Sequence, residues 1–246
     1  MNTDKLIMHN FFQQILKDTE PYSNEVKVAE IESMNDSDIL EIDYYIRNTA
    51  FYATHLFQLC NQLERAIELL SNFTFNSKNG ISRGDHLAYN VENYIIRLTS
   101  LTDRVLQTIN AVYHLGINEK DINDRVVLNN LKVTMTELPK SFNEFRKVLK
   151  DYVSERNVIV HRHSYVKEEL NRIKIFYNTY LSKKMLESNK GDSLKYVRTQ
   201  ALNHYLTQTK KEFTQTNQMC FEKLLLIFDD LDKQYSLMKQ NMKKNH

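Results

Sequence analysis

The stretch SERNVIVHRHSY, which begins at Ser154, gathers side chains suited to chemistry on a phosphate. In order, they are Arg156, Asn157, His161, His163 and Tyr165. A guanidinium can hold a phosphate through a bidentate contact, and an imidazole that titrates near neutral pH can take or give a proton. These residue types suit a phosphate site, but taken alone Arg156 and His161 fit surface salt bridging better, because exposed arginine and histidine are common on helices.

Helical spacing does not bring all of these side chains together. At about 100° per residue, Arg156 and His161 lie roughly 140° apart, whereas Arg156 and His163 lie within about 20° but roughly 10.5 Å apart along the axis. Asn157, His161 and Tyr165 follow at four-residue intervals and therefore share a face. A site made from one such helix would be spread out, but two copies of the chain, related by a two-fold axis at the helix N-termini, could pool their arginines and histidines in one crevice. Helix N-terminal amides would then add to anion binding.

The sequence predicts neither a metal site nor a cofactor. His161 and His163 point about 200° apart on a helix, so they would chelate one metal together only from a strand. The chain also lacks a Gly-rich phosphate loop, a Gly-x-Ser-x-Gly elbow and a His-Glu-x-x-His pair.

A second polar cluster, Glu92, Asn93 and Arg97, precedes the motif in the sequence. Asn93 and Arg97 are one helical turn apart and could support or extend the Arg156 site, but an exposed stripe or internal salt bridges would give the same pattern. Tyrosines such as Tyr89 and Tyr94 could stack on bases. We expect most of the tyrosines to pack inside a bundle with a solvated hydroxyl.

The elements that must position these residues are helices. Only 4 Gly and 2 Pro interrupt the chain, which favours long helices over many short strands. The pattern predicts helices over residues 4–18, 36–73, 85–116, 126–153, 154–187 and 192–239. Pro139 would open a helix or kink one, and Gly116 would end one. Ser154 is a candidate N-cap, with Glu155 in the first turn of the helix that follows.

Composition bounds the partners and the setting. The formal net charge is +2, which gives no global field for nucleic acid, so any RNA-binding surface must be local. Cys60 and Cys220 have no CxxC neighbours, and we expect buried free thiols in a reducing cytosol. No window reaches the roughly 18 apolar residues of a membrane span, and we expect a soluble, cytoplasmic protein without membrane contact.

The motif resembles a known family. Arg156 and Asn157, followed by Val-Ile-Val and His161 late in a helical chain, resemble the signature of the HEPN superfamily. The upstream stretch NVENYIIRLTSLTDRVLQTINAVYHLGI, residues 90–117, resembles the second core helix of one bacterial HEPN family. Together the two similarities cover roughly residues 85–170.

The resemblance implies an all-α antiparallel bundle of HEPN type with additional N- and C-terminal helices. We expect one domain over residues 1–246, with a HEPN-like core at about 36–187 and a C-terminal helical extension at about 192–246.

The resemblance also implies a metal-independent endoribonuclease that works as a homodimer with a composite active site. Arg156 would hold the scissile phosphate of the RNA substrate, His161 would transfer the proton, and Asn157 would be a polar helper. Attack by the RNA's own 2′-hydroxyl would leave a cyclic phosphate. A toxin or phage-defence (antiviral) role, with an antitoxin or regulatory partner, is a further implication.

A longer form of the motif is also present. Arg156 followed by His163-Ser164-Tyr165 resembles HEPN toxins that are paired with a small nucleotidyltransferase, in which the tyrosine is adenylylated. Tyr165 is therefore a candidate modification site, and His163 could share or replace the role of His161. We assign the role to His161 because asparagine directly after arginine fits the shorter form.

Two other functions are consistent with the same sequence. A non-catalytic HEPN-like module would bind RNA, a nucleotide or a protein through the same crevice. A scaffold would use its long helices for protein contacts alone and would be indifferent to changes at Arg156 or His161.

Overall fold

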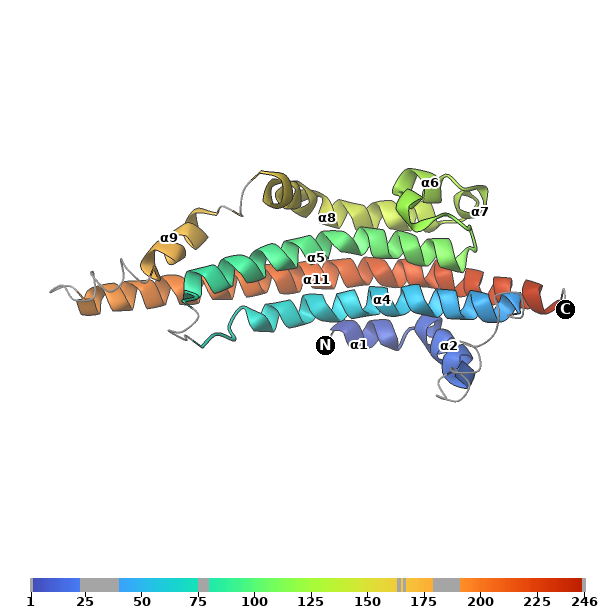
Figure 1. Ribbon diagram of the computed structural model, residues 1–246, viewed down its shortest axis with the longest axis horizontal. Helices are drawn as coiled ribbons and strands as arrows, with labels where there is room; N and C mark the ends of the chain where they lie inside the picture. Colours follow the sequence, from blue (N-terminus) through green and yellow to red (C-terminus); the bar gives the residue numbers. More distant parts are fainter. Residues whose placement is uncertain are drawn as a thin grey trace. The chain divides into compact units, whose positions relative to one another are not determined.

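All regular structure in the described part of the chain is helical. The computed structural model describes residues 2–22, 40–74, 80–162, 165, 167–178 and 191–244. The α-helices are α1 (Asn2–Ile7), α2 (Asn10–Thr19), α4 (Glu41–Leu69), α5 (Arg83–Val112), α6 (Asp124–Leu128), α7 (Leu131–Thr134), α8 (Leu138–His161), α9 (Glu168–Phe176) and α11 (Gly191–Lys244) (Figure 1). Two 3-10 turns, η1 (Glu20–Tyr22) and η3 (Glu119–Asp121), accompany them. The all-α prediction is confirmed.

The first predicted helix is two helices. α1 ends at Ile7 and α2 begins at Asn10. Between them, His9 has extended backbone angles, and its Nδ1 accepts a hydrogen bond from the N–H of Phe11 at 3.2 Å. A histidine is an uncommon N-cap, so the sequence pattern did not predict the break. The predicted stop before Pro21 is confirmed, since α2 ends at Thr19.

The long helices α4 and α5 lie where the scarcity of Gly and Pro predicts them, although residues 36–39 of the first predicted range lie outside the described residues. After α5 the chain turns at Gly116, whose φ of 69° favours glycine. The Asn110 amide closes this turn: its Nδ2 donates to the carbonyl of Ile117, and its Oδ1 accepts from the N–H of Ile117.

Residues 126–153 do not form one helix. Asn123 and Asn130 accept hydrogen bonds from the N–H groups of Val126 and Lys132, each at 3.0 Å, and these caps begin the short helices α6 and α7. Pro139 then occupies the first turn of α8, so it opens a helix, which is one of its two predicted roles.

The prediction of a new helix from Ser154 is wrong. α8 continues without a break through Ser154 and Glu155 and ends at His161. Nothing interrupts the backbone hydrogen bonds there, so a residue suited to a cap is simply an exposed position of a continuous helix. The next described helix, α9, is short, and residues 179–190 lie outside the described residues.

The chain divides into two compact units. Unit 1 comprises Met1–Asn61, Ser100–Val148 and Met219–His246; unit 2 comprises Gln62–Thr99 and Leu149–Gln218. Each of the four long helices contributes one part to each unit.

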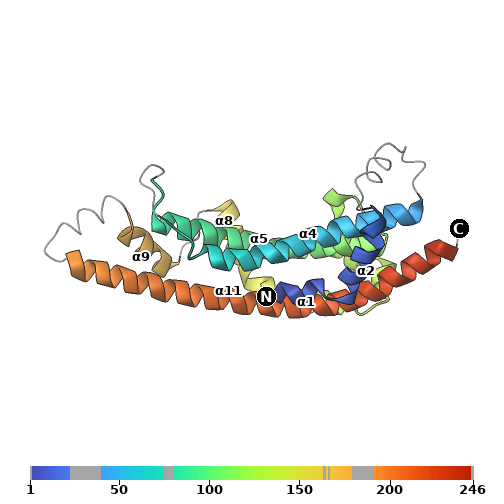
Figure 2. The same ribbon diagram turned by 90° about the horizontal axis from the view of Figure 1, so that it is seen from below.

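Unit 1 has an aromatic core. Phe228 of α11 packs against Phe11 and Phe12 of α2, with ring centroids 5.7 and 5.2 Å apart, and Figure 2 shows α2 adjoining α11. Tyr45 stacks on Tyr235 at 5.6 Å and donates a hydrogen bond to the carbonyl of Val112 at 2.7 Å. Burial of such rings contributes strongly to stability.

Unit 2 joins α5 to α9 and α11 by close contacts. The ring of Tyr94 stacks on Phe213 with centroids 3.6 Å apart, and its hydroxyl donates to Asn217 Oδ1 at 2.9 Å. A Cβ at Gly84 would lie 2.6 Å from Lys174 Cα, so only glycine allows α5 and α9 to approach so closely.

Neither Cys60 nor Cys220 forms a disulfide, and both are fully buried, as the sequence predicts. Among the described helices, none combines the length and the apolar character that a bilayer span requires.

Candidate active site

The motif lies at the C-terminal end of α8, in unit 2. Arg156 and Asn157 occupy the last two turns of the helix, and His161 is its final residue. We expected this site at a helix N-terminus, and that expectation is wrong because α8 does not restart at Ser154. The C-terminal end of a helix carries partial negative charge and favours cations. A phosphate at this site would therefore have to be bound by side chains, without help from helix N-terminal amides.

The Arg156 guanidinium has no carboxylate partner among the described residues. Its Nη1 donates a hydrogen bond to Asn157 Oδ1 at 3.1 Å, and the side chain is half-buried. A neutral amide orients the guanidinium but leaves its charge uncompensated. Such an arginine is suited to a bidentate contact with an incoming phosphate.

His161 is exposed at the end of α8. It is five residues from Arg156 on a continuous helix, so the two side chains project about 140° apart. One copy of α8 therefore does not bring them into a compact pair. His163, the other candidate, lies outside the described residues.

Tyr165 is buried, with only 7% of its surface exposed. Its backbone N–H donates to Glu92 Oε1 at 2.7 Å, and the ammonium of Lys167 lies 5.4 Å from the centre of its ring. Burial raises the pKa of the Tyr165 hydroxyl, and the carboxylates of Glu155 and Glu212 raise it further. Modification of this hydroxyl requires the ring to leave its buried position.

Glu92, a candidate from the sequence, is therefore linked to the motif. It reaches from α5 to the segment directly after α8 and accepts the hydrogen bond that holds the Tyr165 backbone. Hydrogen bonds to charged groups are stronger than neutral ones. Glu92 is positioned to orient this segment.

The burial of the Glu155 carboxyl was not expected, since Glu155 was predicted to lie in the first turn of a new helix. The Glu155 Oε2 atom is buried without a hydrogen-bond partner among the described residues. Burial raises the pKa of this carboxyl, Lys167 opposes the rise, and Glu212 and Asp151 add to it. One sequence signal could have indicated burial: Glu155 lies three residues after Tyr152, which itself lies three after the buried Leu149.

The other two candidates on α5, Asn93 and Arg97, bind each other, and Arg97 also binds Gln62. Arg97 Nε donates to Asn93 Oδ1 at 3.1 Å, and Arg97 Nη1 donates to Gln62 Oε1 of α4. The structure brings Asn93 and Arg97 together, but neither has a recorded contact with Arg156, Asn157 or His161.

Comparison with known proteins settles the family. The chain matches the HEPN_Cthe2314-like HEPN family over residues 8–232. This protein belongs to the HEPN family. The match includes both the motif on α8 and the upstream stretch on α5, and it agrees with the helical fold. The comparisons found no matching curated protein and no matching solved structure.

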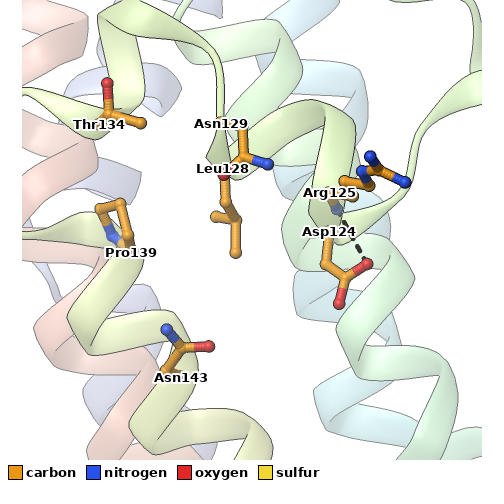
Figure 3. A pocket seen from close by; sticks show the side chains of 7 residues that line it. All are labelled: Asp124, Arg125, Leu128, Asn129, Thr134, Pro139 and Asn143. Carbon is orange, nitrogen blue, oxygen red and sulfur yellow. Dashed lines mark hydrogen bonds between the residues drawn. The ribbon is translucent and has the colours of Figure 1, made fainter.

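Two pockets of this HEPN protein lie in unit 1, and none of the candidate site residues lines them. One, of about 430 Å³, is lined by α6, α7 and the start of α8, with Asp124, Arg125 and Asn143 at its wall (Figure 3). The other, of about 510 Å³, lies between Met135 and Lys233. In the part of the chain that the structure describes, no cluster of three or more His, Cys, Asp or Glu side chains could hold a metal ion.

Proposed function

We propose that this HEPN protein is a metal-independent endoribonuclease with Arg156 and His161 as its catalytic residues and Asn157 as a helper. The observation that supports this best is the Arg156 guanidinium, which is oriented by the Asn157 amide and lacks a carboxylate partner among the described residues. An arginine that served only a surface salt bridge would be expected to contact an acid.

The reaction requires only groups that the chain and the RNA supply. His161 takes the proton of a 2′-hydroxyl, and the resulting oxygen attacks the adjacent phosphorus. The bond from phosphorus to the 5′-oxygen breaks, and that oxygen leaves as the 5′-hydroxyl with the proton that His161 took up. Arg156 stabilises the charge that grows on the non-bridging oxygens. The products are a 2′,3′-cyclic phosphate and a 5′-hydroxyl.

The separation of Arg156 and His161 on α8 has one solution in this proposal: a second copy of the chain. Because Arg156 and His161 project about 140° apart on α8, the arginine of one copy acts with the histidine of the other. Mixing inactive Arg156→Ala and His161→Ala proteins, after exchange of subunits, should restore part of the cleavage. A mixture that stays inactive despite verified exchange would contradict the shared site.

The catalytic assignment is tested by incubating purified protein with total RNA in EDTA. Arg156→Ala and His161→Ala should each abolish cleavage while the circular-dichroism spectrum and sedimentation stay unchanged. Arg172→Ala and His204→Ala are matched controls in unit 2: both side chains are exposed, and Arg172 is ion-paired with Glu168 at 2.5 Å. Equal losses in the controls would refute the assignment.

His163→Ala separates the roles of the two histidines. Loss of cleavage in this variant, with activity kept by His161→Ala, would move the proton-transfer role to His163. Tyr165 remains a proposed modification site, for which its burial requires the segment after α8 to open first.

The biological setting is part of the same proposal. A cytoplasmic ribonuclease of this kind suits a toxin or phage-defence role, held in check by an antitoxin or another regulatory partner. The alternative function, a non-catalytic HEPN module that binds RNA, a nucleotide or a protein, is favoured by the separation of Arg156 and His161 within one chain. RNA that stays intact with dimeric wild-type protein, while Arg156→Ala lowers RNA affinity, would support that alternative.

A further inference from the structure

Arg97 is a second arginine of unit 2 whose charge is not compensated. Both of its recorded hydrogen bonds go to neutral amide oxygens, those of Asn93 and Gln62. Among the described residues it contacts no carboxylate, and its Nη2 donates no hydrogen bond. Two amides thus fix the guanidinium plane and leave one nitrogen available for an anion.

Tyr89 lies on the same stripe of α5 as this arginine. Tyr89, Asn93 and Arg97 are spaced four residues apart, so they follow one another along one face of the helix. The Tyr89 side chain is 70% exposed, and Ile96, seven residues further along the same face, is also exposed. An exposed aromatic ring on the same helical face as an oriented arginine is an arrangement suited to binding an unstacked base and a phosphate of the same strand.

The charge of unit 2 favours a polyanion. This unit has 17 Lys and Arg against 11 Asp and Glu, a formal net charge of +6, in a chain whose total is +2. The field that is absent from the chain as a whole is therefore present in the unit that carries the stripe.

We propose that Tyr89, Asn93, Arg97 and Gln62 form a subsite for one nucleotide of single-stranded RNA. The Tyr89 ring stacks on the base, and Arg97 binds the adjoining phosphate in the orientation that the two amides set. The subsite rests on the proposed function, since RNA is the substrate there. It adds a requirement for an unpaired base, because a base inside an A-form duplex has no free face for the ring.

The test uses the full wild-type chain and a short, fluorescein-labelled, single-stranded 2′-O-methyl RNA of mixed sequence. This probe lacks the hydroxyl nucleophile, so binding is measured without cleavage. Anisotropy titrations at several salt concentrations give both the affinity and its salt dependence. An unlabelled duplex of the same sequence serves as competitor and should compete weakly.

Two substitutions should give different signatures. Tyr89→Ala should weaken binding about tenfold without changing the salt dependence, and Tyr89→Phe should restore it, because stacking needs the ring and not the hydroxyl. Arg97→Gln should weaken binding and lower the slope of log affinity against log salt by about 0.7, the loss of one phosphate contact.

The controls match each change. Tyr44→Ala removes an exposed tyrosine of unit 1, and Arg172→Gln removes one positive charge of unit 2 that Glu168 already neutralises. Both should bind like the wild type. Losses no larger than those of the controls, or no binding of the probe by the wild type, would overturn the subsite. A loss that accompanies altered sedimentation would overturn it in favour of a self-association surface.

The two proposals fail separately. If wild-type protein leaves total RNA intact but Tyr89→Ala still loses affinity for the probe, the catalytic assignment fails and the subsite stands. If cleavage depends on Arg156 while probe binding is indifferent to Tyr89 and Arg97, only the subsite fails.

Discussion

Unit 1 and unit 2 are built from parts of the same four long helices, but their side chains differ in charge. Unit 1 carries 16 Lys and Arg against 20 Asp and Glu, a formal net charge of −4, whereas unit 2 has a net charge of +6. The net charge of the whole chain, +2, does not reveal this difference between the units. A near-neutral chain can therefore still present a strongly basic region to an anionic partner.

The two units also treat their polar side chains differently. In unit 1, Asp18 is bound by both Tyr235 and Lys239. Among the described residues, one side-chain atom of unit 1, Thr49 Oγ1, is buried without a hydrogen-bond partner, whereas unit 2 has three such atoms: Glu155 Oε2, Arg198 Nε and Asn217 Nδ2. Uncompensated buried polar groups cost stability and recur at functional sites. Among the described residues, unit 2 thus has more uncompensated buried polar atoms than unit 1, and it is the unit in which we propose the active site.

The largest effect should come from the core of unit 1. Phe228→Ala removes a ring that packs on Phe11 and Phe12, and it should lower the free energy of unfolding by about 3–5 kcal/mol. Urea denaturation measures this loss. Leu226→Ala, at an exposed position of the same helix, should change it by less than about 0.5 kcal/mol. Similar losses in the two variants would contradict the importance of this core.

In unit 2, Glu92→Leu should destabilise mainly the backbone at Tyr165, which Glu92 holds by a hydrogen bond. Removing a hydrogen bond to a charged group should cost about 1.5–3 kcal/mol, and hydrogen exchange at the Tyr165 amide should accelerate accordingly. Cleavage of RNA should fall as the segment after α8 loses its orientation. Glu92→Gln keeps an acceptor oxygen and should recover most of the protection. Unchanged exchange in Glu92→Leu would show that this bond does not hold the segment.

A smaller loss is expected from Tyr94→Phe. The variant keeps the stacking on Phe213 but removes the hydroxyl that donates to Asn217, for a cost of about 1 kcal/mol in urea denaturation. Tyr89→Phe removes an exposed hydroxyl on the same helix and should be neutral. If both variants unfold like the wild type, the buried hydrogen bond contributes nothing measurable.

The smallest effect should be the pH dependence that Glu155 adds. Burial raises the pKa of its carboxyl above the ordinary value of 4.5, so the native state favours the neutral form. Between the ordinary and the raised pKa the native state binds more protons than the unfolded state, and stability falls as pH rises. Glu155→Gln should therefore be more stabilising at pH 7 than at pH 4.5. A difference of the opposite sign would mean that the carboxylate is stabilised in the fold.

The sequence predicted the long helices because few residues in it can end one. The breaks that it did not predict depend on caps at His9 and Asn130, whose hydrogen bonds are not distinguishable from those of ordinary exposed polar side chains in the sequence. Ser154 gave the opposite error, because a good cap residue ends a helix only where the backbone turns.

The candidate site was predicted in part. Glu92, Asn93 and Arg97 were candidates. Asn93 and Arg97 bind each other one helical turn apart, but the partner of Glu92 and the second partner of Arg97 are distant in the sequence. The pairing of Glu92 with Tyr165 and of Arg97 with Gln62 depends on how helices pack, and helical spacing within one segment carries no information about it.

The central claim is that unit 2 holds an RNA-cleaving site that uses the 2′-hydroxyl of its substrate. Mapping the ends of RNA fragments produced by wild-type protein in EDTA tests it most directly. The account predicts 2′,3′-cyclic phosphates and 5′-hydroxyls that disappear with Arg156→Ala. Fragments that end in 5′-phosphates, or cleavage that persists in Arg156→Ala, would contradict it.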